Sequence, residues 1–192
     1  MNQQDTKVAD VAVVGAGAAG LMTAIQATRL GLRTLLLDGR DKIGAKILMS
    51  GGTRCNVTNR AVTEKDFWTG APHTLRSALK AFTPAETIAF FAELGVELKL
   101  EPTGKYFPVT DRAQDVLDAL VGEARRAGVE LVTPHKIRHV TFDPGASDAR
   151  GSGAAGSATK GLFTLFSDDD RRFTARTVVL TTGGLSFPAT GS

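Results

Sequence analysis

Residues 9–20 read ADVAVVGAGAAG, an apolar run that leads directly into glycines at positions 15, 17 and 20. The apolar run 9–14 predicts a short buried strand, because consecutive apolar residues are typical of a strand covered on both faces. In the pattern Gly-x-Gly-x-x-Gly, Gly15 permits a tight turn, Gly17 lets the backbone approach a pyrophosphate, and Gly20 lets a helix pack against the strand. The stretch therefore predicts a strand, a turn and a helix that together bind a dinucleotide.

The residues that follow supply the rest of this unit. Apolar residues at helical spacing predict a helix that ends near Gly31, and residues 33–37 (RTLLL) predict a second buried strand that delivers Asp38. The N–H groups at the start of the helix, including those of Ala18 and Ala19, attract phosphate together with the helix dipole. An acid at the end of the second strand accepts hydrogen bonds from an adenosine ribose, which indicates an adenine dinucleotide.

Gly39 and Arg40 follow this acid, and Arg40 bears on the choice of dinucleotide. An arginine just past the second strand can receive a ribose 2′-phosphate, as in proteins that bind NADP. The carboxylate of Asp38 would repel that phosphate. Arg40 is therefore interpreted as a solvated loop residue, and NADP is not the favoured cofactor.

Composition narrows the class of protein. The chain has 192 residues, 42% of them hydrophobic, and a formal net charge of +3, which suits one substantial core. Its basic residues are scattered among acids, which argues against nucleic acid as a partner. The first residues lack the apolar core of a secretory signal and no apolar run is long enough to cross a bilayer, so we expect a cytoplasmic protein with no membrane partner. Cys55 is the only cysteine and the three histidines lack ligand spacing, so we expect no disulfide and no metal site.

Residues 44–59 form a stretch dense in Gly, Ser, Thr and Asn, where an ordinary NAD-binding unit would continue through a helix to a third strand. Backbone N–H groups, hydroxyls and amides of this kind can hold a pyrophosphate and a flavin ring. A surface loop without function has the same composition. Composition alone leaves both interpretations open.

The remaining elements carry clear local signals. Thr83, Pro84 and Glu86 form a capping box with proline at the first helical position, which predicts a helix from Pro84 to about Leu94. Turn residues and apolar stripes further predict a hairpin of strands 96–101 and 105–109, a helix that opens at Asp111 and ends at Gly128, and a third parallel strand over 129–133.

Short apolar segments dominate the last third of the chain. They predict an antiparallel meander of strands 137–142, 162–166 and 172–175, followed by a final buried strand over 177–182. Residues 144–161 are rich in Gly, Ser and Ala with almost nothing to bury, which predicts a flexible hairpin insertion. The whole pattern predicts an α/β fold, a Rossmann-like parallel sheet with flanking helices and an antiparallel β-meander.

Three motifs carry a resemblance to a known family. They are KILMSGGTRCNVTN at 46–59, YFPV at 106–109 and TGGLSFP at 182–188. With the glycine motif, the acid and the meander, they resemble the glutathione-reductase-type FAD-binding domain of the two-dinucleotide-binding flavoproteins. More narrowly, the chain is similar to the aminoacetone oxidase family of bacterial FAD-binding proteins.

This resemblance implies an FAD site assembled from several segments. The three glycines would hold the pyrophosphate, Asp38 the ribose, and residues 50–56 the flavin, while Ile137 would lie by the adenine through its backbone. The expected cofactor-binding residues are Gly15, Gly17, Ala18, Ala19, Gly20, Asp38, Gly39, Arg40, Lys46, Ser50, Gly51, Gly52, Arg54, Asn56, Ile137, Thr182, Gly183 and Gly184.

The resemblance also has limits along the chain. In the family a second domain interrupts the sheet and a carboxyl-terminal segment returns to cover the flavin. Residues 1–192 are therefore expected to be an incomplete, truncated FAD-binding domain that lacks both parts. Asp38 stands where glutamate is more usual, and Gly44-Ala45 stands where many flavoproteins have paired glycines.

The resulting functional hypothesis is an FAD-binding oxidoreductase that moves a hydride through the bound flavin, present here as a fragment. NAD(P)H is the candidate electron donor, and the small-molecule substrate is unknown. An NAD-dependent dehydrogenase and a catalytically silent dinucleotide-binding module are the alternatives. Arg54, Cys55 and Asn56 are the candidate neighbours of the reactive ring, and Cys55 is interpreted as inert because no second cysteine exists to pair with it.

Overall fold

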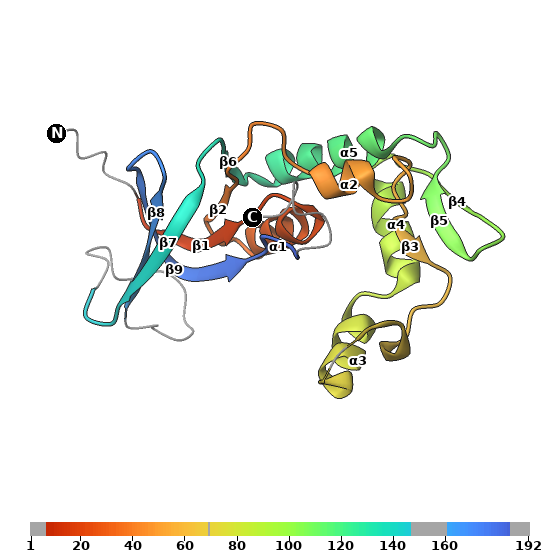
Figure 1. Cartoon of the computed structure of the whole chain (residues 1–192), viewed down its shortest axis with the longest axis horizontal. Coiled ribbons are helices and arrows are strands. Elements are labelled where there is room, and N and C mark those ends of the chain that lie inside the picture. Colours follow the sequence, from red (N-terminus) through yellow and green to blue (C-terminus); the bar gives the residue numbers. More distant parts are fainter. Residues whose placement is uncertain (1–6, 69, 147–160, 185–192) are drawn as a thin grey trace. The chain divides into compact units, whose positions relative to one another are not determined.

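The computed structural model describes residues 7–68, 70–146 and 161–184. The chain divides into two compact units, one formed by Met1–Ala45 with Glu123–Ser192 and the other by Lys46–Gly122. Figure 1 shows the order of the elements along the chain. Each unit is described by itself.

The first unit is built on a six-stranded sheet in the order β6-β2-β1-β9-β8-β7. Strands β6, β2, β1 and β9 pair in parallel, and β9, β8 and β7 pair antiparallel. The elements of this unit are β1 (Ala9–Val14), α1 (Ala18–Arg29), β2 (Thr34–Leu37), β6 (Glu130–Val132), β7 (Ile137–Asp143), β8 (Leu162–Ser167) and β9 (Arg172–Leu180). The predicted α/β fold, with its parallel sheet and its meander, is confirmed.

Strand β9 corrects one prediction. Segments 172–175 and 177–182 were expected to be two strands, but Arg172–Leu180 is continuous. Ala175 pairs with Phe163 of β8 on one side and with Ala9 of β1 on the other. Arg176, between the two predicted segments, lies within β9 with its Nε 3.5 Å from Asp10 Oδ1, and the strand ends at Leu180, before the predicted residue 182.

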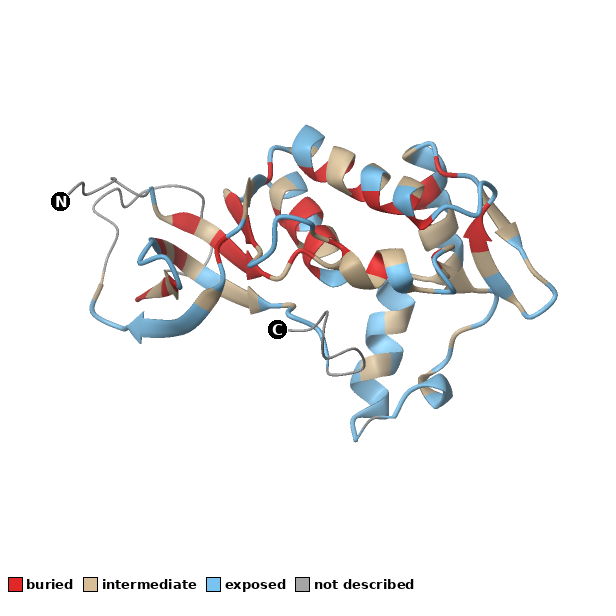
Figure 2. Ribbon diagram, turned by 45° about the horizontal axis from the view of Figure 1, so that its top comes forward, coloured by how far each residue is buried: buried red, intermediate tan, exposed pale blue. Residues whose placement is uncertain are grey.

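The core of this unit lies on both faces of the central strands. Helix α1 packs against β1 and β2, and Leu21 and Ile25 on α1 are fully buried. The opposite face carries the cluster Ala9, Ala12, Val14, Leu35, Leu37, Leu165, Phe173 and Ala175. Figure 2 shows the buried residues gathered in the strands and in the helices packed on them. Burying one such leucine stabilises a fold by about 1.5–3 kcal/mol. Because many such residues are buried on both faces, the sheet holds the loops at its ends in fixed positions.

The second unit contains a three-stranded antiparallel sheet in the order β3-β5-β4. Its elements are α2 (Ala45–Met49), β3 (Thr58–Asn59), the 3₁₀ helix η1 (Glu64–Asp66), α3 (Pro72–Ala81), α4 (Pro84–Glu93), β4 (Leu98–Leu100) and β5 (Lys105–Pro108). Helix α5 (Ala113–Ala127) begins in this unit and ends in the first. The predicted hairpin and the predicted helix from Pro84 are confirmed.

Two expectations for this unit need adjustment. The stretch 44–59 is not entirely loop, because it holds the short helix α2 and the strand β3. The helix expected to open at Asp111 begins at Ala113, since the Asp111 side chain binds Lys99 and Arg54 instead of capping the helix. Helix α3 and η1 were not predicted.

The insertion expected over 144–161 lies in the first unit, between β7 and β8. Residues 147–160 of it lie outside the described residues. The two strands that it connects pair through Asp143 and Leu162.

No helix in the described part of the chain is long and apolar enough to span a membrane.

The capping box of α4 gives a test of this local structure. The Thr83 hydroxyl accepts from the backbone N–H of Glu86 at 3.3 Å, and the Glu86 carboxylate accepts from the Thr83 N–H at 2.7 Å. We expect Thr83→Ala to lower the free energy of unfolding by about 1 kcal/mol, because the first turn of α4 would begin with an uncapped N–H. Thr83→Ser keeps the hydroxyl and should match the wild type in urea unfolding. An alanine variant as stable as the serine variant would contradict this role.

Candidate functional site

The glycine loop at the carboxyl end of β1 is the centre of the site. Gly15 has φ 106°, and its N–H donates to Leu37 O at 2.7 Å, which ties the loop to the end of β2. The Thr181 hydroxyl donates to Val14 O at 2.9 Å and to Gly15 O at 2.8 Å. The loop is therefore held by backbone groups of β2 on one side and by the residue after β9 on the other.

The three glycines have different local surroundings. A Cβ on Gly15 would lie 2.7 Å from Thr181 O, and a Cβ on Gly20 would lie 1.8 Å from Gly15 O. Neither position has room for a side chain, as the tight turn and the helix packing require. A Cβ on Gly17 would meet nothing within 4 Å. Only the middle glycine faces open space, as a backbone that approaches a bound pyrophosphate must.

The amino terminus of α1 presents its N–H groups without a side-chain cap. Gly17 is the N-cap residue and has no side chain to accept a hydrogen bond, and the first turn contains no acid. Ala18 and Ala19 are exposed in this first turn. The helix dipole and the uncapped N–H groups favour an anion at this position.

Asp38 joins the two strand ends. Its Oδ2 accepts from the N–H of Ala16 at 2.7 Å, and its Oδ1 accepts from the N–H of Arg40 at 2.9 Å. Its backbone carbonyl accepts from the N–H of His135 at 2.8 Å. A carboxylate has about four lone-pair sites, so two remain for further donors such as ribose hydroxyls. The acid therefore lies beside the glycine loop, as the dinucleotide interpretation requires.

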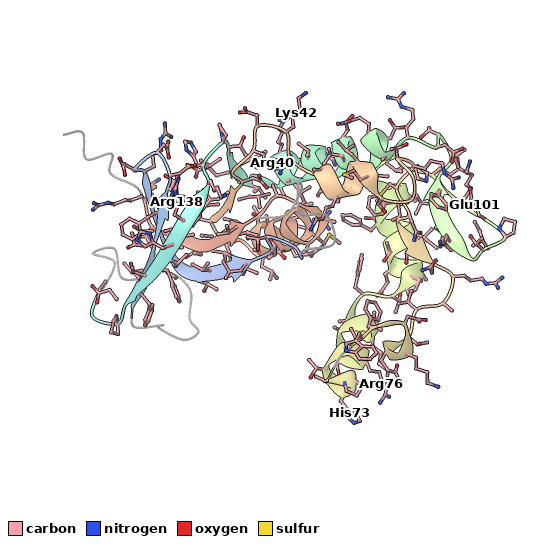
Figure 3. The ribbon with its side chains drawn as sticks, in the orientation of Figure 1. Arg40, Lys42, His73, Arg76, Glu101 and Arg138 are labelled. Atoms are coloured by element: carbon pink, nitrogen blue, oxygen red, sulfur yellow. The ribbon has the colours of Figure 1, made fainter. Side chains whose placement is uncertain are left out.

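The neighbouring predicted residues lie on two adjacent segments of the first unit. Gly39 and Arg40 are exposed, and a Cβ on Gly39 would lie 2.9 Å from the Cβ of Lys136. Ile137, the first residue of β7, is half-buried against the core cluster. Figure 3 labels Arg40 on the loop that follows β2. The structure thus brings the segment after β2 next to the start of β7.

The segment after β9 contains three predicted cofactor-binding residues and one further residue, Thr181, that the sequence did not single out. Thr182, Gly183 and Gly184 are exposed, and Gly183 has φ 86°. Thr181, half-buried just before them, makes the contacts with the glycine loop. The signal that could have singled it out is its position directly after a strand parallel to β1, where a hydroxyl reaches the neighbouring turn.

The other predicted residues belong to the second unit. The Ser50 carbonyl accepts from the N–H of Cys55 at 2.9 Å, which closes residues 50–55 into a tight loop after α2. Gly51 and Gly52 have positive φ values of 56° and 67° and are exposed. A Cβ on Gly51 would lie 2.6 Å from the Phe107 ring, so glycine is needed there for space as well as for conformation.

Arg54 is bound to carboxylates within this unit. Its Nη1 lies 2.5 Å from Glu101 Oε1 and 3.4 Å from Asp111 Oδ1, and its Cζ lies 4.1 Å from the centroid of the Phe107 ring. The hydrogen bond to Glu101 is the main cause that raises the pKa of the guanidinium above its ordinary value. The expectation that Arg54 contacts a flavin directly stays a prediction.

Three further predicted residues lie in or beside this loop, namely Lys46, Cys55 and Asn56. Burial raises the pKa of the Cys55 thiol to about 11, so it stays protonated at neutral pH and agrees with the inert interpretation. Asn56 Oδ1 is buried without a hydrogen-bond partner among the described residues. Lys46 lies on α2 and is half-buried.

The fold and the glycine loop define a Rossmann-type dinucleotide-binding protein. The model of the family described as "HI0933-like protein Rossmann domain" matches residues 9–192, and the chain belongs to this family.

Curated relatives and solved structures agree with this fold. The chain is 31% identical over 180 residues to a ribosomal RNA dihydrouridine synthase of Haemophilus influenzae, covering 94% of this chain and 41% of that protein. It is 32% identical over 184 residues to a 3-dehydro-bile acid delta(4,6)-reductase of Clostridium scindens, covering 95% and 41%. The chain thus spans 41% of the length of these relatives.

Among solved structures, THI4 from Thermovibrio ammonificans superposes with a TM-score of 0.55 at 16% identity, covering 88% of this chain and 55% of that one. A 3-ketosteroid-delta4-(5alpha)-dehydrogenase from Rhodococcus jostii superposes with a TM-score of 0.55 at 16% identity, covering 95% and 47%. At this identity the likeness concerns the fold.

The difference between Gly20 and Gly17 can be measured. We expect Gly20→Ala to lower the free energy of unfolding by about 2 kcal/mol or more, because its Cβ would overlap Gly15 O and shift the helix or the turn. Gly17→Ser should change stability by less than about 0.5 kcal/mol, because the position is open and serine is a good N-cap residue. Equal urea midpoints for the two variants would contradict the assigned packing.

The charges around Asp111 give a pH prediction. A hydrogen bond from Lys99, and a weaker one from Arg54, hold the pKa of the Asp111 carboxyl below its usual range. The resulting stabilisation is complete above the ordinary aspartate pKa of about 3.9 and is lost as the pH falls through the lower folded-state value. The stability difference between wild type and Lys99→Met should therefore be constant above that pH and shrink below it. Urea unfolding at several pH values tests this, with the exposed Lys105→Met as the control.

Proposed function

We propose that this chain is the FAD-binding part of a flavin-dependent oxidoreductase. The observation that carries the proposal is the contact of Asp38 Oδ2 with the N–H of Ala16 at 2.7 Å, beside an uncapped helix terminus and an open Gly17. These groups lie at the carboxyl ends of the adjacent parallel strands β1 and β2. Ligands of open α/β sheets bind at that edge.

The residues of the first unit suit the adenylate half of the cofactor. The N–H groups of Ala18 and Ala19 donate to the pyrophosphate, and the open side of Gly17 lets the phosphates approach the backbone. The free lone pairs of Asp38 accept from the ribose hydroxyls. The backbone of Ile137 contacts the adenine, while Gly39, Arg40 and the segment Thr182, Gly183 and Gly184 border the pocket.

The residues of the second unit suit the flavin half. The proposed flavin-binding residues of this unit are Lys46, Ser50, Gly51, Gly52, Arg54 and Asn56. Gly51 and Gly52 have positive φ values, and the buried Asn56 Oδ1 has no hydrogen-bond partner among the described residues. Successive N–H groups in such turns create a concave donor surface. When bound, FAD supplies hydride transfer, and these residues orient it and exclude water.

The organisation of the chain supports FAD over NAD. In a plain NAD-binding unit, one helix connects the second and third parallel strands. In this chain the unit Lys46–Gly122 intervenes between β2 and β6, and an antiparallel meander leads into β9. The family and a relative named as a reductase support the redox class. An NAD-dependent dehydrogenase is therefore the less favoured candidate.

The electron donor and the substrate belong to the proposal as well. The proposed electron donor to the flavin is NAD(P)H. The relatives are named for ribosomal RNA and for a 3-dehydro-bile acid, and the resemblance stated above concerns aminoacetone oxidases. Reoxidation of the reduced flavin by a ribosomal RNA fragment or by a steroid enone tests the first two substrate classes. Reduction of the oxidised flavin by aminoacetone tests the third, because an oxidase takes electrons from its substrate.

The central test is Gly17→Val. The valine side chain would occupy the open space beside the glycine loop and block the pyrophosphate, so we expect the variant to lose FAD. It should still fold, with a loss of about 1 kcal/mol or less, because valine at an N-cap costs no more than a poor cap. Flavin absorbance after purification and titration with FAD measure retention, and urea unfolding confirms the fold.

The controls separate the rival functions. Gly17→Ser leaves a small side chain at the same position and should retain part of the FAD affinity. Cofactor released from the wild type should be FAD by chromatography. A colourless wild type that binds NAD would favour the dehydrogenase, and a yellow protein that no NAD(P)H reduces would favour the silent binding module. A folded Gly17→Val variant with unchanged FAD retention would refute the proposed site.

A further inference from the structure

Four charged side chains form a network at the loop that follows α2, and one of them, Arg54, belongs to this loop. Arg54 lies between Glu101 and Asp111, and Lys99 donates to the other oxygen of Asp111. Both guanidinium Nη atoms face Glu101, at 2.5 Å and 3.5 Å from its two oxygens. The guanidinium also lies over the ring of Phe107 on β5, with 4.1 Å from its Cζ to the ring centroid. The network thus connects the loop to the β4–β5 hairpin.

Residues in and beside this network have a strained backbone conformation. Thr53 and Cys55, on either side of Arg54, have φ values of 70° and 64°, and Asp111 has φ 55°. Left-handed conformation is unfavourable for residues other than glycine and persists only where the surroundings impose it. Arg54 is therefore the side chain through which the hairpin and the turn at Asp111 can fix the two strained residues.

Backbone hydrogen bonds fix the ends of the loop but leave its middle to the side chains. The N–H of Cys55 donates to Ser50 O at 2.9 Å, and the N–H of Ala113 donates to Thr53 O at 3.2 Å. The exposed edge between them is Gly51 and Gly52, which have no side chain to hold them. Gly51 lies against the ring of Phe107, the same ring that the Arg54 guanidinium covers, so the side chain of Arg54 and this edge share one support on β5.

We propose that Glu101 is a positioning residue for the flavin ring, acting through Arg54 to hold the 50–56 loop in its ligand-ready conformation. The inference rests on the proposed function, in which this loop borders the flavin. Glu101 does not touch the cofactor in this role. It reduces the number of conformations that the loop must give up when the flavin binds.

Glu101 is better suited to this role than Asp111. Its side chain is 26% exposed against 42% for Asp111, and it engages both Nη atoms of Arg54. Its backbone is fixed in the hairpin turn, because its N–H donates to Lys105 O at 2.9 Å and its carbonyl accepts from the N–H of Gly104 at 2.8 Å. A charge anchored in a hairpin turn can hold an arginine in one place, and a charge-assisted pair with two contacts also fixes its orientation.

Glu101→Gln tests the proposal, since it keeps the shape of the side chain and removes its charge. The probes are FAD and ADP, which share the adenylate half and differ in the flavin. We expect the dissociation constant for FAD to rise about tenfold. This is the effect expected if, without the charge of Glu101, the 50–56 loop adopts its binding conformation only about one-tenth of the time, because the apparent affinity falls with that fraction. The dissociation constant for ADP should change less than about twofold, and the long-wavelength absorption band of bound FAD should shift.

The matched control is Glu64→Gln. Glu64 forms an ion pair of 2.6 Å with Arg76 near α3 in the same unit, away from the 50–56 loop. Figure 3 labels Arg76 and Glu101 on different parts of the unit. This variant should bind FAD and ADP like the wild type. A rise in the FAD dissociation constant equal to that of Glu101→Gln would show a general loss of charge and would overturn the proposal.

The remaining outcomes separate the two levels of the argument. If the wild type binds ADP and FAD, and Glu101→Gln leaves the FAD affinity and the flavin spectrum unchanged, the positioning role is wrong and the proposed function stands. If Glu101→Gln weakens FAD and ADP equally, the effect is general destabilisation and the positioning role is again wrong. If the wild type binds no FAD, the proposed function fails and the inference falls with it.

Discussion

The hydrogen bond from the N–H of Ala16 to the carboxylate of Asp38 is the constraint on which the rest of the site depends. It joins the turn after β1 to the end of β2, residues that are 22 positions apart in sequence. Hydrogen bonds to a charged group contribute about 1.5–3 kcal/mol, enough to select one conformation of a short loop. With the Asp38 side chain fixed in this way, its carboxylate keeps acceptor capacity beyond the N–H groups of Ala16 and Arg40. The same bond therefore shapes the turn and positions the acceptor.

Much of this first unit could be predicted because local and long-range requirements agree there. Gly15 and Gly20 are required by contacts with Thr181 and Gly15, so the glycine pattern in the sequence directly reports close packing. In the second unit, the capping box at Thr83 and the left-handed Gly95 likewise mark the ends of α4 by chemistry within a few residues. Signals of this kind do not need the rest of the fold. They were sufficient to predict the central strands and the helix between them.

The features that escaped prediction depend on distant partners. Helix α3 begins after Ala71, whose side chain cannot accept a hydrogen bond, so Pro72 at the first helical position is a start signal without a capping residue beside it. Thr53 and Cys55 adopt a conformation typical of glycine, and the carboxylates that hold Arg54 between them come from Glu101 and Asp111, far along the chain. Composition could identify residues 44–59 as a special loop, but the side chains that hold it could be named only from the structure. The role of that loop beside a flavin stays a proposal.

Strand β9 has a consequence that reaches beyond the sheet. Its first half pairs with β8 of the meander and its second half pairs with β1, and its backbone passes directly into Thr181, which contacts the glycine loop. One continuous strand therefore links β8 of the meander to the glycine loop. A slip of one residue in the pairing of β9 with β1 would turn every β9 side chain to the opposite face of the sheet and withdraw the Thr181 hydroxyl from Gly15. A single deletion within β9 would likewise change the register of the residues that follow it and move Thr181 relative to the glycine loop.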